Sequence, residues 1–269
     1  MIFGFIFVFV LGAIIGSFLN VVILRYNSGR TIGGRSGCLS CGTTLSAIDM
    51  IPILSWILLK GRCRNCCSKI SMQYPLVEFL TGALFTLLFW MSLPLLEYPN
   101  LMALYFFWNA VIFSILIVIF VYDLRHKIIP DGLSYTFAIL AFIQAVTTNP
   151  IYSEYSTIYL FNLLSGLIMF TPFFILWLIS SGRWIGLGDG KLALGIGWYL
   201  GFVNGLSAII LAFWVGAVFA IGLMLIERLN KDHKNITMKT EIPFAPFLII
   251  GVLIEFFIRA DVIGINLFF

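Results

Sequence analysis

The run IFGFIFVFVLGAIIGSFLNVVIL at residues 2–24 contains no charged side chain, and it is the first of several apolar segments that decide the fold. About 20 consecutive apolar residues suffice to cross roughly 30 Å of hydrocarbon as a helix. Seven further candidate spans follow, near residues 76–96, 101–122, 130–148, 157–180, 189–203, 205–227 and 244–267. The sequence therefore predicts an all-α polytopic membrane protein with about eight transmembrane helices.

The overall composition agrees with this prediction. Of the 269 residues, 61% are hydrophobic and 10% are charged, whereas about a quarter of the residues in a soluble domain are charged. In a signal peptide, positive charges precede the apolar run. Here the first positive charge, Arg25, follows it. We therefore expect residues 1–24 to remain as the first transmembrane helix.

The basic residues predict the orientation of these spans, because short loops rich in Lys and Arg stay in the cytoplasm. Fifteen of the sixteen Lys and Arg residues fall in alternate loops, at 25–75, 123–129, 181–191 and 228–241, and only Arg259 lies elsewhere. The intervening loops near 97–100, 149–156 and 203–205 contain no basic residue. We expect an outside N-terminus, with the basic loops in the cytoplasm. The formal charge of +4 reflects this orientation, and no nucleic-acid partner is expected.

The polar insert at 25–75 contains all five cysteines of the chain. Cys38 and Cys41 form one Cys-x-x-Cys pair, and Cys63 and Cys66 form a second pair 21 residues later, a spacing typical of zinc knuckles in which each pair supplies two thiolates. Free or disulfide-bonded thiols are the alternative, although a disulfide is uncommon on the cytoplasmic side. We expect a structural zinc site made of Cys38, Cys41, Cys63 and Cys66, with Cys67 as a bystander.

Two aspartates lie at the edges of predicted spans. Asp123 ends the third span and Asp189, in the sequence Gly186-Leu-Gly-Asp-Gly-Lys, begins the sixth, so both carboxylates are expected at the same depth on the cytoplasmic side. Ionisable groups in a membrane usually mark a functional site. Two close carboxylates can share one proton, so that one activates water while the other polarises a carbonyl group. This pair therefore predicts hydrolysis of a peptide bond.

Helix capping is a competing explanation for these acids. Asp189 and Asp131 precede apolar helices, where an acid is favoured by the helix dipole. Glu78 enters the second span, where it could either face the same site as the aspartates or cap that helix. Capping does not explain Asp123, because an acid at the carboxyl end of a helix opposes that dipole. Asp123 and Asp189 are therefore the predicted catalytic residues.

The chain resembles the bacterial type IV prepilin leader peptidase and N-methyltransferase family, whose members are membrane aspartic proteases with a Gly-x-Gly-Asp motif. The matching motifs occur in order along nearly the whole chain. They are Gly16–Arg25, Cys38 and Cys41, Ile51-Pro52, Leu54–Trp56, Gly61–Cys63, Cys66, Ile70-Ser71, Tyr74–Glu78, Asp123–Asp131, Gly186–Asp189 with Lys191, and Ile242–Phe247.

This resemblance implies cleavage of prepilin-like leaders after a glycine at the cytoplasmic membrane face, with Asp123 and Asp189 as the catalytic pair and Asp131 as a non-catalytic position. It also implies N-methylation of the new N-terminus with S-adenosylmethionine, for which the residues themselves predict no binding site. The expected domains are residues 1–24 as the first transmembrane helix, 25–75 as the cytoplasmic zinc domain and 76–269 as the polytopic aspartic peptidase domain.

Two alternatives remain at this stage. The chain could be a peptidase without methyltransferase activity, or a non-enzymatic membrane scaffold or transporter whose aspartates line an ion path. Transporters commonly carry inverted repeats, which this sequence lacks. The expected partners are prepilin or pseudopilin substrates and membrane lipid, in a bacterial inner membrane. The oligomeric state is not predicted.

Overall fold

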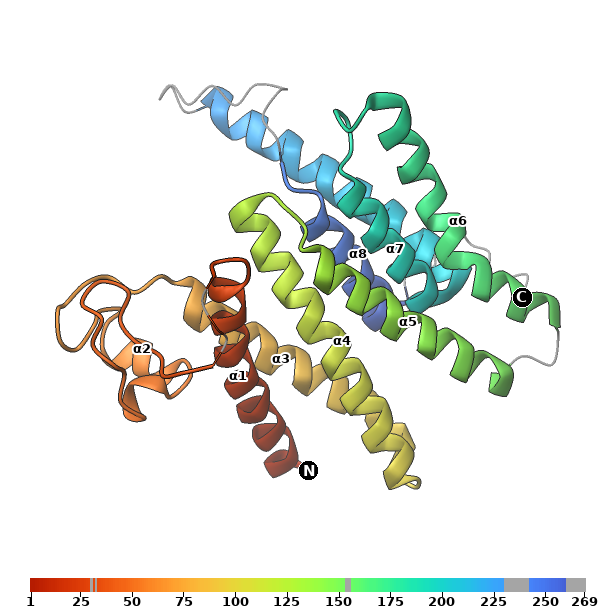
Figure 1. Cartoon of the computed structure of the whole chain (residues 1–269). Helices are drawn as coiled ribbons and strands as arrows, with labels where there is room; N and C mark the ends of the chain where they lie inside the picture. The colour runs from red at the N-terminus through yellow and green to blue at the C-terminus, as the bar shows by residue number, and fades with distance from the viewer. Residues whose placement is uncertain (30, 32, 153–155, 230–241, 260–269) are drawn as a thin grey trace. The chain divides into compact units, whose positions relative to one another are not determined.

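The computed structural model describes the chain except for residues 30, 32, 153–155, 230–241 and 260–269 (Figure 1). The helices are α1 (Ile2–Arg25), η1 (Ile48–Met50), α2 (Leu54–Leu58), α3 (Gln73–Ser92), η2 (Leu93–Leu95), α4 (Pro99–His126), α5 (Asp131–Tyr152), α6 (Ser156–Ser180), α7 (Leu187–Leu229) and α8 (Ala245–Ile258). Within the described residues, β structure is limited to two isolated bridges in the polar insert. The predicted all-α class is confirmed.

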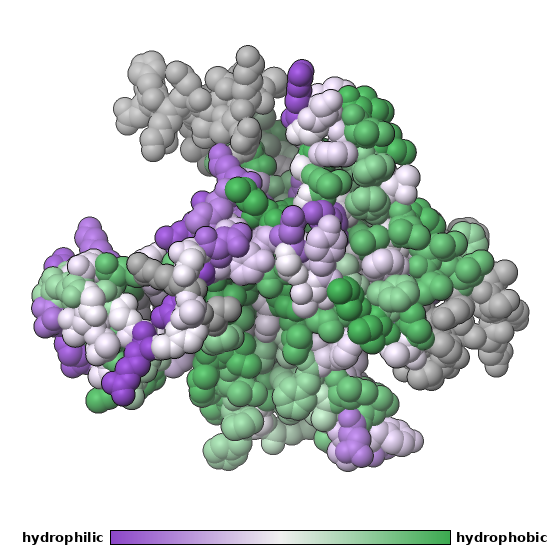
Figure 2. Space-filling view, in the orientation of Figure 1, coloured by the Kyte–Doolittle hydropathy of each residue, from purple (hydrophilic) through white to green (hydrophobic). Residues whose placement is uncertain are grey.

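The apolar helices match the predicted spans closely. Among the described residues, five helices are long and apolar enough to cross a membrane, namely α1, α3 with η2, α4, α6 and α7. Two shorter apolar helices lie at Asp131–Thr147 within α5 and at Ala245–Ile258, which is α8. Most of the basic loop at 228–241 and the end of the span predicted at 244–267 lie outside the described residues. Large parts of the surface are apolar, as expected for helices in lipid (Figure 2).

Helix α7 consists of two helices, which correspond to the two spans predicted at 189–203 and 205–227. The break lies at Gly201, slightly before the predicted loop, where the backbone has φ 80° and ψ −177°. Residues other than glycine rarely adopt this backbone conformation. The second half then runs back beside the first. This is seen at Gly205, where a Cβ would lie 3.3 Å from the Cα of Gly197.

The chain forms two compact units, Met1–Val118 and Ile119–Phe269. In the first unit, α1 packs against α3 through Gly12 and Gly16, which lie one turn apart on α1. A Cβ on Gly12 would lie 2.8 Å from the Cα of Gly82, and a Cβ on Gly16 would lie 2.8 Å from the Cα of Glu78. Such close approach supplies the packing that holds helices together in lipid.

The second unit is built around α7, which contacts α5, α6 and α8 (Figure 1). Small residues again set the spacing: a Cβ on Gly197 would lie 2.7 Å from the Cα of Gly166 on α6. Ser165 beside it donates a hydrogen bond to the Gly197 carbonyl at 2.7 Å. These contacts fix the start of α7, which carries Asp189, against its neighbours.

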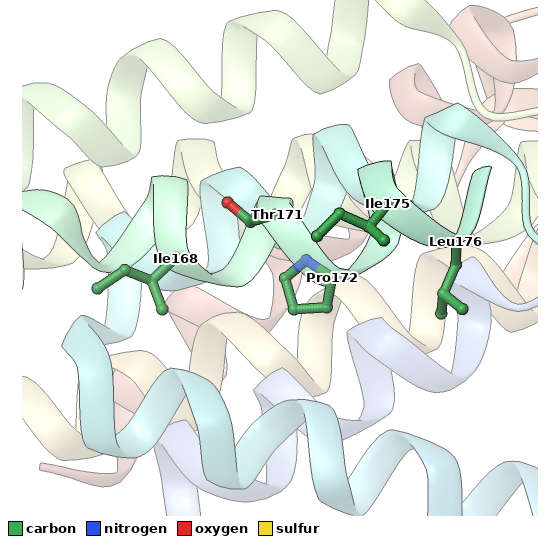
Figure 3. A pocket seen from close by; sticks show the side chains of 5 residues that line it. All are labelled: Ile168, Thr171, Pro172, Ile175 and Leu176. Atoms are coloured by element: carbon green, nitrogen blue, oxygen red, sulfur yellow. The ribbon is translucent and has the colours of Figure 1, made fainter. Parts of the chain in front are cut away.

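A shallow apolar depression lies on α6, where Pro172 interrupts the helix interior. Its lining residues are Ile168, Thr171, Pro172, Ile175 and Leu176 (Figure 3). A proline here cannot donate its backbone hydrogen bond to the preceding turn, and its ring displaces that turn. Since all five residues belong to one helix, we interpret the depression as part of the lipid-facing surface.

Candidate active site and metal centre

Asp123 lies in the last turn of α4, with a side chain that is buried and only 3% exposed. The backbone N–H of Ala245, the first residue of α8, donates to its carboxylate. The amino end of α8 therefore presents its partial positive charge to an acid that opposes the dipole of its own helix. This contact explains how the fold tolerates an aspartate at the carboxyl end of α4.

Asp189 lies in the first turn of α7 and is also buried, at 9% exposure. The backbone N–H of Gly186 donates to its carboxylate, and the Asp189 N–H donates to the Gly186 carbonyl at 3.2 Å. A tight turn thus holds this side chain from two sides. The glycine at 186 keeps the space beside the carboxylate open, since a Cβ there would lie 3.5 Å from Oδ2 of Asp189.

The structure brings the two predicted catalytic residues together, since Asp123 and Asp189 are close enough to interact electrostatically. Each carboxylate also keeps one buried oxygen without a hydrogen-bond partner among the described residues, Oδ2 of Asp123 and Oδ1 of Asp189. Buried polar atoms in proteins are nearly always paired, so unpaired atoms call for a functional explanation. These two oxygens are available to bind a water molecule and a substrate carbonyl group.

The loop between α4 and α5 packs directly on the Gly-x-Gly-Asp turn. A Cβ on Gly188 would lie 3.0 Å from the Cβ of Ile129, so any larger residue at 188 would push this loop away. On the other side of the turn, Lys191 Nζ and Asp131 Oδ1 form an ion pair at 2.7 Å. Asp131 is exposed in the first turn of α5, where an acid is favoured by the helix dipole, and this ion pair joins α5 to α7.

The two cysteine pairs form knuckles with the same backbone hydrogen bonds. In the first knuckle, the Cys38 N–H donates to the Thr43 carbonyl, and the Gly42 N–H donates back to the Cys38 carbonyl. In the second, the Cys63 N–H donates to the Ser68 carbonyl, and the Cys67 N–H donates back to Cys63. The two bridges of the insert, Gly37 with Thr44 and Arg62 with Lys69, close the same two turns.

This equivalence explains the fifth cysteine. Cys67 occupies the place of Gly42 in the second knuckle, and both residues have a positive φ, 57° at Cys67 and 71° at Gly42. A residue with a side chain costs about 1–2 kcal/mol in this left-handed conformation. Cys67 therefore occupies a position that favours glycine.

The geometry of the four remaining cysteines fits a metal ion. The sulfur atoms of Cys38, Cys41, Cys63 and Cys66 all lie within 4.8 Å of one another. The Cys38 and Cys66 sulfurs are 3.8 Å apart. Zn–S bonds of about 2.3 Å in a tetrahedron place sulfurs roughly 3.8 Å apart, so the observed spacing needs little adjustment.

In the first knuckle, the surroundings of Cys38 and Cys41 favour the thiolate form that a metal requires, whereas the pKa of Cys63 in the second knuckle is raised. Backbone amides of Cys41 and Ser40 lower the pKa of Cys38 to about 6. The hydroxyl and amide groups of Thr43 lower the pKa of Cys41. These four cysteines are thus placed to bind a metal, in a closed site that leaves no open position for catalysis.

Sequence reasoning missed three backbone contributions to these sites. They are the Ala245 N–H at Asp123, the left-handed turn at Cys67, and the Ile53 N–H, which donates to the buried Glu78 carboxylate at 2.7 Å. Backbone donors carry no residue-type signal, although the adjacent motifs Ile242–Phe247 and Ile51-Pro52 do mark two of these places. Glu78 was expected either to face the site of the aspartates or to cap its helix, and the hydrogen bond from Ile53 gives it a further role, because it joins the polar insert to α3.

Two family models match successive parts of the chain. Residues 10–92 match the family model of the bacterial peptidase A24 N-terminal domain, and residues 110–221 match that of the type IV leader peptidase family. No solved structure matches the chain.

Curated relatives cover most of the chain. One from Aeromonas salmonicida is 31% identical, over 91% of this chain and 87% of its own length, and one from Bacillus subtilis is 30% identical over 95% of each chain. Both are named prepilin leader peptidase/N-methyltransferase. A third relative, from Escherichia coli, is 34% identical over 93% of this chain and 92% of its own, and is named type 4 prepilin-like proteins leader peptide-processing enzyme. The chain belongs to the type IV leader peptidase family.

Proposed function

We propose that this protein cleaves leader peptides from type IV prepilins or prepilin-like proteins, with Asp123 and Asp189 as the catalytic pair. The observation that carries the proposal is the pair of buried, interacting carboxylates, each with one oxygen that has no hydrogen-bond partner among the described residues. The names of the relatives supply the substrate class.

The mechanism follows from a pair that carries one proton. The ionised carboxylate removes a proton from water as the water oxygen attacks the scissile carbonyl carbon, while the protonated carboxyl group donates a hydrogen bond to the carbonyl oxygen. Collapse of the tetrahedral intermediate breaks the C–N bond, and a carboxyl proton passes to the leaving amine. Gly186 places no side chain beside the Asp189 carboxylate, so an extended peptide can approach this carboxylate closely.

The metal in the cysteine insert is proposed to be Zn²⁺ in a structural role. Four thiolates complete its tetrahedral coordination, so Cys38, Cys41, Cys63 and Cys66 would hold the fold of the insert and not activate water. A region of about 50 residues with few buried apolar side chains needs such a crosslink. The insert thus becomes a rigid body attached to α1 and α3.

The basic loops support placing both sites at the cytoplasmic face of a bacterial inner membrane, with the N-terminus outside. Asp123 follows the third predicted span and precedes Arg125 and Lys127, while Asp189 is followed by Lys191. Cleavage at this face would release the leader into the cytoplasm and leave the apolar part of the substrate in the membrane.

N-methylation of the new N-terminus, with S-adenosylmethionine as methyl donor, is the second proposed activity and rests on the names of the relatives. One experiment tests both activities. The full-length protein in detergent is incubated with a synthetic prepilin-like peptide and S-adenosylmethionine, and the products are weighed by intact-mass spectrometry.

We expect loss of the leader and a gain of one methyl group on the mature fragment. Cleavage without the methyl group would reduce the protein to a peptidase. If several leaders remain uncut, the peptidase proposal is wrong and the scaffold alternative gains ground.

A further inference from the structure

The polar insert carries an exposed apolar stripe that neither proposed site uses. Leu54, Ile57 and Leu58 of α2 are 58%, 57% and 76% exposed, and their spacing of i, i+3 and i+4 places them on one side of the helix. Ile48 and Ile51, just before α2, are also exposed, at 64% and 43%. Soluble surfaces rarely gather so many large apolar side chains, so the stripe indicates an interaction surface.

The opposite side of α2 packs onto the insert itself. The indole N–H of Trp56 donates to the Ile70 carbonyl at 3.3 Å, and a Cβ on Gly61 would lie 2.8 Å from the Trp56 ring. Helix α2 is therefore fixed in its orientation. The apolar stripe faces outward because Trp56 holds the helix from behind.

A buried hydrogen bond then sets the depth of this stripe. The Ile53 N–H, directly before α2, donates to Glu78, which lies in the second turn of α3 and is 7% exposed. Glu78 faces Gly16 of α1, nine residues before Arg25, the first charged residue after the apolar run. At 1.5 Å per residue, the Glu78 backbone lies about 13 Å along α1 from Arg25, toward the predicted membrane interior, and the Glu78 side chain holds the residue before α2 within its own reach of this level.

The charges beside the stripe indicate what kind of surface it contacts. The insert at 25–75 contains seven basic residues and one acid, Asp49, which is paired with Arg64 at 2.8 Å. Lys60, Arg62 and Lys69 follow α2 and are exposed. An apolar stripe beside basic residues is typical of helices that lie in the membrane interface, where the apolar face enters by about 5–10 Å and the basic groups meet anionic headgroups.

We propose that residues 48–58 form an interfacial membrane anchor, with Leu54, Ile57 and Leu58 inserted among the acyl chains of the leaflet on the side of the insert. The cysteine knuckles are then held against the membrane surface and do not hang free in solution. This proposal depends on the contacts within the first unit and not on the catalytic assignment.

Photocrosslinking of the full-length protein in nanodiscs of phosphatidylcholine and phosphatidylglycerol tests the anchor. Leu58 is replaced by p-benzoylphenylalanine, and Leu39, which is 70% exposed in the first knuckle, is replaced in a matched control. We expect an adduct with the mass of one lipid at position 58 and no lipid adduct at position 39. Equal lipid adducts at both positions, or none at 58, would overturn the proposal.

The same samples distinguish the other possible occupants. With a prepilin-like peptide present, a crosslink from position 58 to that peptide, or to another part of this chain, in place of lipid would also overturn the proposal. Metal content reports whether each variant has folded. Because a variant could fail to fold, the unaltered protein is also labelled with a phosphatidylcholine that carries a diazirine in its acyl chain. Label on residues 54–58 is expected, and label confined to the long helices would refute the anchor.

Discussion

Replacement of Gly201 by alanine tests whether the reversal inside α7 has the conformation described here. At φ 80° and ψ −177°, a residue with a Cβ is strained by about 1–3 kcal/mol. The new Cβ would also lie 3.0 Å from Oδ1 of Asn162, which accepts a hydrogen bond from the Phe202 N–H at 3.3 Å. Weakening that bond adds about 1 kcal/mol. The expected destabilisation is therefore about 2–4 kcal/mol.

Thermal unfolding in a fixed detergent measures this effect. At about 2–4 °C per kcal/mol for a chain of this size, the destabilisation corresponds to a fall in Tm of roughly 4–16 °C. Gly222→Ala provides the matched control, because Gly222 lies inside the second half of α7, where a Cβ would meet no atom within 4 Å. Alanine is also the better helix former by about 1 kcal/mol. The Tm of this variant should be unchanged or higher. Equal Tm values for the Gly201 variant and the parent would refute the reasoning.

Three further predictions concern the insert and the acids around the site. Cys38→Ser should release the bound metal, whereas Cys67→Gly should retain it and stabilise the insert by about 1–2 kcal/mol, because glycine suits the left-handed turn. Metal content and thermal unfolding distinguish these outcomes, and loss of metal in both variants would contradict the knuckle assignment. Asp131→Asn should keep the rate of peptide cleavage within about fivefold of the parental rate, since an ion pair with an exposed partner contributes at most about 1 kcal/mol. A loss of rate as large as that expected for Asp123 or Asp189 would show that Asp131 does more than join two helices. Glu78→Ala should destabilise the attachment of the insert by about 1–3 kcal/mol because it leaves the Ile53 N–H without its acceptor, whereas Glu78→Gln keeps an acceptor. Limited proteolysis measures this effect: Glu78→Gln should keep most of the parental resistance, and equal resistance of Glu78→Ala and the parent would exclude the attachment.

The sequence predicted the helical class, nearly all of the apolar segments and the approach of the two aspartates. Hydrophobic length is sufficient for the spans because every backbone polar group in lipid must be bonded within its own helix. These features depend on residue type and on short-range spacing, which a sequence shows directly.

The features that could not be predicted depend on contacts between distant segments. The amide of Ala245 reaches Asp123 only because α8 begins beside the end of α4, and the amide of Ile53 reaches Glu78 only because of the turn before α2. The strained position of Cys67 became visible only by comparison with Gly42 in the other knuckle. Backbone groups are the same in every residue, so no pattern of side chains marks them.

The most direct test of the account is cleavage of a prepilin-like peptide by Asp123→Asn and Asp189→Asn, each measured against the parent in the same detergent. Asparagine has nearly the same shape but cannot take up or release the proton that the mechanism needs. We expect each variant to lose cleavage by about 10²–10⁴-fold while metal content and Tm stay close to those of the parent. Turnover near the parental rate in either variant would contradict the aspartate pair.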